Sequence, residues 1–170
     1  MKRIRRVFAR LFAAERQSKS RSVHIPVADG SVELAIVPDP AAEDVRAIRE
    51  AIYQYNRSKA GDQHYQALTI LAHDRRGRLV GGLLGATFWR WLTVDFLWIA
   101  EGLRGQGHGS RLLLAAEREA QRRGCKYACL DTFSFQARDF YEKLGYAPFG
   151  VLDDFPGEHK RYFLAKTLRR

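Results

Sequence analysis

The sequence predicts one α/β domain built on a mixed β-sheet with helices on both faces. Three observations support this fold class. The amino-terminal third combines hairpin-like alternation with one amphipathic helix, the middle third holds three closely spaced apolar runs, and the last third alternates helices with strands. Strands are expected at residues 23–28, 31–37, 67–73, 79–88, 91–100, 126–132, 146–152 and 161–168, and the later helices at 107–123 and 136–144.

The first helix is expected to begin at Asp39-Pro40, because Asp caps a helix N-terminus well and Pro fits its first turn. It is expected to end within residues 56–61. Four apolar side chains are expected to form its buried stripe: Val45, Ile48, Ile52 and Tyr55. Before it, apolar and polar residues alternate on both sides of Asp29-Gly30, which predicts a β-hairpin.

Residues 1–22 form a basic tail that differs from the rest of the chain. They carry +7 of the net charge of +10, and residues 23–170, the predicted domain, carry +3. Ile4, Val7, Phe8, Leu11 and Phe12 have the spacing of one apolar helical stripe. A helix on a membrane surface, a nucleic-acid arm and an organelle transit peptide all fit this pattern. A leader that packs only weakly fits it too and is the preferred interpretation.

The composition predicts a soluble, cytoplasmic protein without a metal site. Apolar residues make up 46% of the chain and charged residues 28%, and no apolar run approaches the ~20 residues that span a bilayer. Cys125 and Cys129 would lie about 13 Å apart on a strand, too far for a disulfide. No His or Cys stands near them at a metal-ligand spacing, so no zinc site is expected.

The segment Leu97 to Ser110 runs from an apolar strand through a glycine-rich turn into a helix. The first N–H groups of a helix have no internal partner and lie at the positive end of its dipole. Glycines at 105, 107 and 109 let a phosphate approach the backbone closely, and Arg104 adds a positive charge. The turn therefore predicts an anion site suited to a pyrophosphate. It lacks the Gly-Lys-Ser/Thr of a Walker A loop, and Ser110 breaks the dinucleotide pattern Gly-x-Gly-x-x-Gly.

Two motifs carry a resemblance to a known family. Arg104-x-x-Gly107-x-Gly109 is similar to the acyl-CoA signature Gln/Arg-x-x-Gly-x-Gly/Ala of the GNAT N-acetyltransferase superfamily. The segment from Ala137 to Tyr146 resembles the downstream Ala-x-x-Phe/Leu-Tyr-x-x-x-Gly-Phe/Tyr of the same superfamily, in the same order along the chain. The resemblance spans roughly residues 31–168. Many members have Asn seven residues before the Tyr, where this chain has Ser134.

The resemblance implies the GNAT fold, in which a mostly antiparallel sheet of six to seven strands splits between two adjacent parallel strands. Acetyl-CoA, the expected cosubstrate, would lie in that split. Its pyrophosphate would bind the backbone of the glycine turn, and its pantetheine arm would pair with the strand before it. The N–H of Ile99 would hold the developing oxyanion. The expected cofactor-binding residues are Leu97, Trp98, Ile99, Arg104, Gly105, Gln106, Gly107, His108, Gly109, Ser110, Ser134 and Tyr141.

By the same resemblance, an amine attacks the thioester directly and Tyr141 protonates the departing thiolate. The base is sought among carboxylates. Asp95 lies inside an otherwise apolar strand, where a carboxylate is costly unless it is used. It shares strand parity with Leu97 and Ile99 unless a bulge intervenes. Asp95 is therefore the first candidate base or ammonium anchor and Glu101 the second. An ion pair of Asp95 with an arginine, a solvated Glu101 and a water chain as base remain alternatives.

The acceptor pocket is expected between the first helix and the last hairpin. Its candidate walls are Tyr53, Tyr55, Asn56, Trp89 and Trp91, and the acidic loop before the last strand holds Asp153, Asp154, Glu158 and His159. Acidic residues near a cleft would suit a cationic amine, and a solvated loop is an equal alternative.

The sequence thus predicts an acetyl-CoA-dependent N-acetyltransferase acting on the primary amine of a small molecule. A protein or peptide acetyltransferase and a non-catalytic acyl-CoA-binding or nucleic-acid-associated module are the alternatives. The +3 body argues against specific nucleic-acid binding. Weak contact of the tail with a membrane surface stays open, no transmembrane segment is expected, and the chain is expected to be a monomer or a homodimer.

Overall fold

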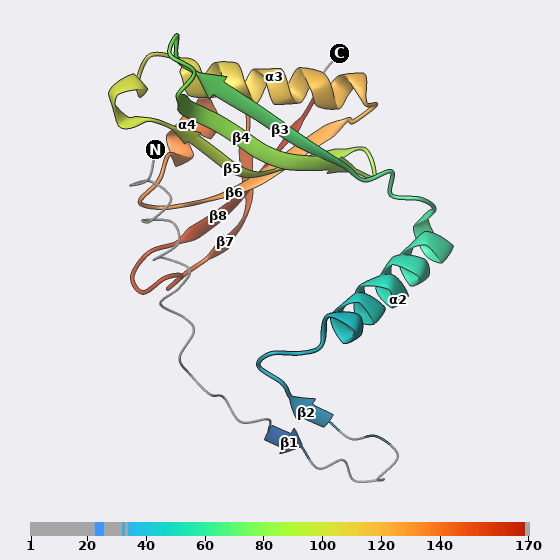
Figure 1. The fold of residues 1–170 in the computed structure, drawn as a ribbon. Helices are drawn as coiled ribbons and strands as arrows, with labels where there is room; N and C mark the ends of the chain where they lie inside the picture. Colours follow the sequence, from blue (N-terminus) through green and yellow to red (C-terminus); the bar gives the residue numbers. More distant parts are fainter. Residues whose placement is uncertain (1–22, 26–31, 33, 169–170) are drawn as a thin grey trace. The chain divides into compact units, whose positions relative to one another are not determined.

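The computed structural model describes residues 23–25, 32 and 34–168 (Figure 1). The chain forms two compact units, Met1–Lys59 and Ala60–Arg170. The basic tail and the Asp29-Gly30 turn lie outside the described residues.

The amino-terminal unit contains the predicted hairpin strands and helix. Strand β1 (Val23–Ile25) pairs antiparallel with β2 (Leu34–Ile36), in shorter strands than the alternation predicts. Helix α2 (Ala42–Ala60) continues past Asn56, where the sequence predicted its end to begin. The prediction of a buried stripe is wrong, because the helix buries none of its residues and Ile48, Ile52 and Tyr55 are exposed. Arg57 and Lys59 in the last turn favour this continuation because cations stabilise the negative end of the helix dipole. Gly61, with φ of 75°, then supplies the left-handed residue that ends many helices.

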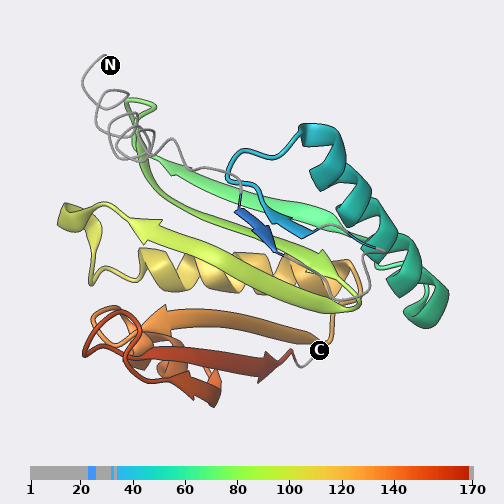
Figure 2. The same ribbon diagram turned by 90° about the horizontal axis from the view of Figure 1, so that it is seen from below.

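The second unit is built on a six-stranded sheet with the order β3-β4-β5-β6-β8-β7 (Figures 1 and 2). Its strands are β3 (Gln66–His73), β4 (Leu79–Phe88), β5 (Trp91–Ile99), β6 (Tyr127–Phe133), β7 (Ala147–Leu152) and β8 (Arg161–Thr167). Only β5 and β6 are parallel, and all other neighbours are antiparallel. This confirms the predicted mixed, mostly antiparallel sheet with one parallel pair.

Helix α3 (His108–Arg122) lies across β3, β4 and β5 on one face of the sheet (Figure 1). It buries Leu112, Leu113, Ala116 and Ala120, the side chains that its sequence periodicity places on one face. Leu83, Leu92 and Leu164 are fully buried in the core beneath it, as is Leu113 of the helix itself. Gly124, with φ of 85°, follows the helix as predicted. Helix α4 (Arg138–Lys143) packs its Phe140 and Tyr141 against the same core.

Within the described residues, no helix is long and apolar enough to cross a membrane. No group of three or more His, Cys, Asp or Glu side chains that could hold a metal ion occurs in that part of the chain either.

Candidate active site

The parallel pair β5–β6 is short and ends in the middle of the sheet. Its register runs only from Trp91↔Tyr127 to Val94↔Leu130, although both strands continue. Beyond this last pair the strands diverge, and we call the diverging region the split (Figure 2). The split has a strand edge on each side.

A β-bulge in β5 lies at the start of the split. Leu84 pairs with Phe96 and the next residue, Gly85, pairs with Val94, so Asp95 has no partner on β4. The extra residue interrupts the alternation of side chains along the strand. Val94 and Ile99 both face the core under α3, although they are five residues apart. Asp95 therefore does not share a simple strand parity with Leu97 and Ile99, because the bulge that would break this parity is present.

A second carboxylate, Asp131, lies at the same level on β6 and was not predicted. It follows Leu130, as Asp95 follows Val94, so both aspartates come directly after the last parallel pair. Burial, and then the charge of Asp131, raise the pKa of Asp95 above its ordinary value. The available signal was an aspartate after the apolar residues 127–130 of a predicted strand, which is similar to the signal that identified Asp95.

Tyr141 belongs to this group of side chains. It lies on α4, packs against the core, and has Phe140 and Tyr146 as edge-on neighbours, with ring centroids 4.9 and 6.2 Å away. Burial, followed by the charge of Asp131, raises its pKa above that of a free phenol. Asp131 thus lies within electrostatic reach of both Asp95 and Tyr141, and the phenol stays protonated at neutral pH.

Arg161 on β8 fixes Asp131. Its Nε donates a hydrogen bond of 2.6 Å to Oδ2 of Asp131. The guanidinium also lies 5.3–5.6 Å from the ring centroids of Phe133, Phe155 and Phe163. The pair compensates part of the charge of Asp131, whereas Asp95 has no ion-pair partner among the described residues.

The glycine turn connects β5 to α3 as predicted. After the 3-10 helix η1 (Glu101–Leu103), Gly105 and Gly107 adopt φ values of 75° and 78°, which favour glycine. A Cβ on either residue would meet no atom within 4 Å, so the outer side of the turn is open. The N–H groups at the start of α3 follow directly, since Gly107 is its N-cap and no side chain caps it.

The remaining turn residues stabilise its shape. Arg104 Nε donates to the carbonyl oxygen of Ile99 at 3.1 Å, and Gln106 Nε2 donates to that of Gly102 at 3.1 Å. Gly109 lies where α3 meets α4, because a Cβ there would be 3.4 Å from Phe140. His108 and Ser110 occupy the first turn of α3, and Glu101 is exposed at the start of η1.

Ser134 has partners within the protein. Its hydroxyl lies 3.2 Å from Nδ1 of His159 and accepts a hydrogen bond of 3.2 Å from the Lys160 N–H. Ser134 therefore joins the segment after β6 to the segment before β8. Its contact with CoA stays a prediction.

The structure does not bring Trp89 and Trp91 to the split. Trp89 lies in the two-residue turn between β4 and β5, and Trp91 begins β5 and stacks on Tyr127 at a centroid distance of 4.8 Å. Four residues separate Trp91 from Asp95, about 13 Å along a strand. Tyr53, Tyr55 and Asn56 lie on α2, in the other unit, and their role stays a prediction. In the acidic loop, Asp153 pairs with Lys160 at 2.5 Å.

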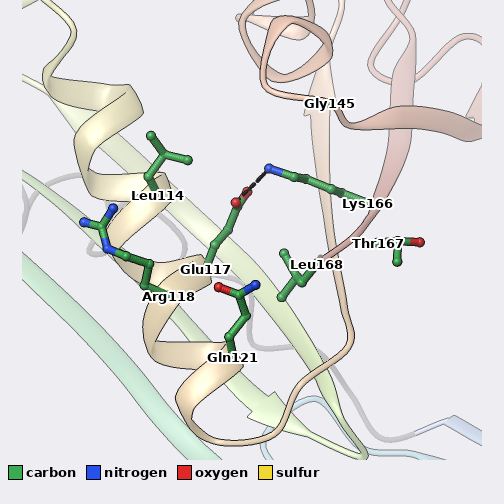
Figure 3. Close-up of a pocket in the computed structure, with 8 residues that line it drawn as sticks. All are labelled: Leu114, Glu117, Arg118, Gln121, Gly145, Lys166, Thr167 and Leu168. Atoms are coloured by element: carbon green, nitrogen blue, oxygen red, sulfur yellow. Dashed lines mark hydrogen bonds and ion pairs between the residues drawn. The ribbon is translucent and has the colours of Figure 1, made fainter. Parts of the chain in front are cut away.

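A separate cavity of about 570 Å³ lies between α3 and the end of β8 (Figure 3). Glu117 and Lys166 point toward each other across it, and Lys166 Nζ donates to both carboxylate oxygens at 2.7 and 2.9 Å. None of the predicted site residues lines this cavity. The residues that line it connect α3 to β8 and stabilise the elements that carry the site.

Known proteins resemble this chain over most of its length. The profile of the Acetyltransferase (GNAT) family matches residues 34–146. The chain is 43% identical to the blasticidin-S acetyltransferase of Streptomyces morookaense, over 79% of this chain and 96% of that protein. It is 38% identical to acetyltransferase Atu2258 of Agrobacterium fabrum, over 70% of this chain and 85% of that protein. A crystal structure of an acetyltransferase from Bacillus cereus matches with a TM-score of 0.72 and 34% identity, over 78% of this chain and 97% of that one.

Members of the GNAT family use acetyl-CoA as the acetyl donor. The matched residues include the split, the glycine turn and α4, the parts that the two sequence motifs identified. The chain therefore belongs to the GNAT acetyltransferase family and is an N-acetyltransferase.

Proposed function

We propose that this enzyme transfers an acetyl group directly from acetyl-CoA to a primary amine of a small molecule within a ternary complex. One observation carries the proposal. Asp95 and Asp131 follow the last pair of β5–β6, and Tyr141 lies within electrostatic reach of Asp131. A group that removes a proton and a group that supplies one thus lie near the split.

The donor binds on the side of the glycine turn. The pyrophosphate of acetyl-CoA accepts hydrogen bonds from the N–H groups of residues 104–110, at the positive end of the α3 dipole. The pantetheine arm pairs with the free edge of Leu97 to Ile99. The Ile99 N–H holds the thioester oxygen as it becomes an oxyanion.

The chemistry requires two proton movements. The amine nitrogen forms a bond to the acetyl carbon as the carbon–sulfur bond breaks, and the electron pair of that bond leaves with sulfur. Asp95 takes the proton that the amine loses, and Tyr141 donates its phenolic proton to the thiolate. Glu101 remains the second candidate base, because it begins η1 two residues after the end of β5.

The small-molecule acceptor is supported by the relative whose name is blasticidin-S acetyltransferase, since the match covers 96% of that protein. A protein or peptide acceptor is the alternative within the same family. A silent acyl-CoA-binding module is the alternative of another class, and the presence of Tyr141 argues against it.

Calorimetric titration with acetyl-CoA, CoA and NAD tests the donor site. Acetyl-CoA and CoA should bind and NAD should not, and Gly107→Glu should abolish binding by placing a strained, negatively charged residue in the anion site. Gly77→Glu is the matched control, because Gly77 has a similar φ of 72° and open space in the turn between β3 and β4. Absence of any CoA binding by the native chain would refute the donor site.

Turnover of Tyr141→Phe tests the acid. We expect kcat to fall by ~100-fold or more, the range for a lost general acid, with the affinity for acetyl-CoA kept. Tyr127→Phe, at the other end of the parallel pair, should leave kcat unchanged. An unchanged kcat in Tyr141→Phe would remove Tyr141 from the mechanism and leave the donor site intact.

A further inference from the structure

Arg161 has more hydrogen-bonding capacity than the protein uses. A guanidinium carries five N–H donors. Among the described residues, only Nε has an acceptor, which is Oδ2 of Asp131 at 2.6 Å. The edge formed by the two terminal nitrogens of the guanidinium has no hydrogen-bond acceptor among the described residues. The side chain is 31% exposed, so solvent reaches part of it.

The guanidinium is also held in position before any ligand arrives. The ion pair with Asp131 fixes one side of it, and the rings of Phe133, Phe155 and Phe163 surround it at 5.3–5.6 Å. Arginine held in this way loses little side-chain entropy on binding, and its planar edge matches a carboxylate with two parallel hydrogen bonds.

Arg161 lies close to the split. In the β6–β8 ladder, Arg161 pairs with Phe133, two residues beyond Asp131 and on the face opposite the buried Leu130 and Thr132. The Arg161 guanidinium contacts the carboxylate of Asp131, and both Asp131 and Asp95 come directly after the last β5–β6 pair. The cationic edge therefore lies at the end of the split where the candidate base is found.

Flat apolar surface lies beside the same edge. Phe135 and Phe155 are 56% and 43% exposed, and Phe133 and Phe135 are stacked with centroids 5.2 Å apart. Such rings favour contact with a planar part of a ligand. The region therefore offers one unpaired carboxylate, one cation with a free edge and a ring surface.

We propose that the acceptor is a zwitterionic amine, whose amino group reaches Asp95 while a carboxylate elsewhere on the molecule binds the free edge of Arg161 and a planar portion lies on Phe135 and Phe155. This inference rests on the proposed function and names its substrate class. The charges are complementary, because Asp95 can pair with an ammonium group and the remaining N–H donors of Arg161 can pair with a carboxylate. The amino group of the acceptor approaches the split from one end, and the carboxylate of the same molecule stays outside the split.

Three matched probes test this arrangement: 4-(aminomethyl)benzoate, 4-(aminomethyl)benzamide and benzylamine. They share the ring and the amine and differ in the group at the far end. In titrations of the protein saturated with CoA, the benzoate should bind on the order of tenfold more tightly than the benzamide, as charge-assisted hydrogen bonds predict. Equal affinities, or no binding of the benzoate, would overturn the proposal.

Two substitutions assign the preference to Arg161. Arg161→Met should abolish the preference for the benzoate, and Arg161→Lys should reduce it while keeping a cation beside Asp131. Arg122→Met is the control, because Arg122 is likewise paired with a carboxylate, Glu119, but lies at the end of α3. A preference that survives both Arg161 variants refutes the assignment. If the protein prefers the benzoate but acetylates none of the three probes, the anion site is supported and the proposed function is refuted.

Discussion

A single extra residue in β5 determines where the carboxylate of Asp95 lies. Without the bulge, Asp95 would pair with a residue of β4 and take its place in the strict alternation of the strand. With the bulge, Asp95 has no partner on β4 and lies at the level of Asp131. The pKa of Asp95 is raised by burial and by that neighbour, so its protonated form is favoured more than for an aspartate in water.

We predict that Asp95→Asn lowers kcat and removes the acidic limb of the pH profile that belongs to this residue. A base acts only when ionised, so activity falls as the pH drops through the raised pKa of Asp95. The limb should therefore lie above the usual aspartate value of about 3.9. Initial rates measured across pH for both proteins check this. A variant whose acidic limb is the same as in the wild type would assign the base role to Glu101 or water.

The same substitution should stabilise the protein at neutral pH. A carboxyl whose pKa is higher in the folded state binds protons more tightly there. The free energy of unfolding of the wild type therefore declines as the pH rises from about 3.9 to the raised pKa. The advantage of Asp95→Asn should grow across this window and vanish below it. Urea unfolding at two pH values measures it, and a variant less stable at both would contradict the pKa direction.

At the scale of elements, the close approach of β4 and β5 holds the bulge in place. A Cβ on Gly85 would lie 2.1 Å from the carbonyl oxygen of Thr93. That contact is with backbone, so no side chain can move aside to relieve it. Glycine is needed here because of space, and its φ plays no part.

Gly85→Ala should therefore force β4 and β5 apart at the bulge. We expect the free energy of unfolding to fall by about 1–3 kcal/mol, as for other overpacked sites, and kcat to fall because Asp95 moves. Gly102→Ala is the stability control, since a Cβ there meets nothing within 4 Å and should change stability by less than about 0.5 kcal/mol. Equal stabilities of the two variants would show that the strands relax at no cost.

The ion pair across the cavity joins α3 to β8. Glu117 is 8% exposed and Lys166 is 19% exposed, and Lys166 also lies 5.5 Å from the ring centroid of Tyr146 (Figure 3). Burial, and then the charge of Glu117, raise the pKa of Tyr146, so its phenol remains neutral. One charged pair thus connects the helix of the glycine turn with the strand that carries Arg161.

Lys166→Met should cost about 3–5 kcal/mol of unfolding free energy, because it leaves the Glu117 carboxylate buried without its cation. The double variant Glu117→Met/Lys166→Met should recover most of this loss, since no charge then remains uncompensated. Thermal and urea unfolding of the three proteins give the comparison. If the double variant is as unstable as the single one, packing and not charge explains the loss.

At the scale of the whole molecule, the sequence predicted the helices and strands better than the contacts between them. Apolar periodicity located every strand of the six-stranded sheet and both of its helices, because burial of one face produces that periodicity directly. The bulge at Asp95, the partnership of Asp131 with Arg161 and the position of Trp89 depend on strand register. Register is set by contacts between distant segments, and no local pattern records it.

The chain lacking residues 1–22 should bind acetyl-CoA as the full chain does. The residues proposed for the donor site lie within Ala60–Arg170, while the tail contributes +7 of the net charge. Removing it should lower the salt concentration at which the protein leaves a polyanionic resin, because fewer positive charges remain. Loss of acetyl-CoA binding on truncation would assign the tail a part in the site.

The short parallel pair has a consequence for the backbone amides of the split. Past Val94 and Leu130, each strand keeps one ladder and has no strand on its other side among the described residues. Amide protons on those inner edges should exchange quickly with deuterated solvent in the free protein, while neighbours that point to β4 or β8 exchange slowly. Acetyl-CoA should slow the exchange of the inner-edge amide protons of β5 and leave those of β6 unchanged. The exchange rates therefore report which strand edge the donor occupies, and the experiment requires no acceptor.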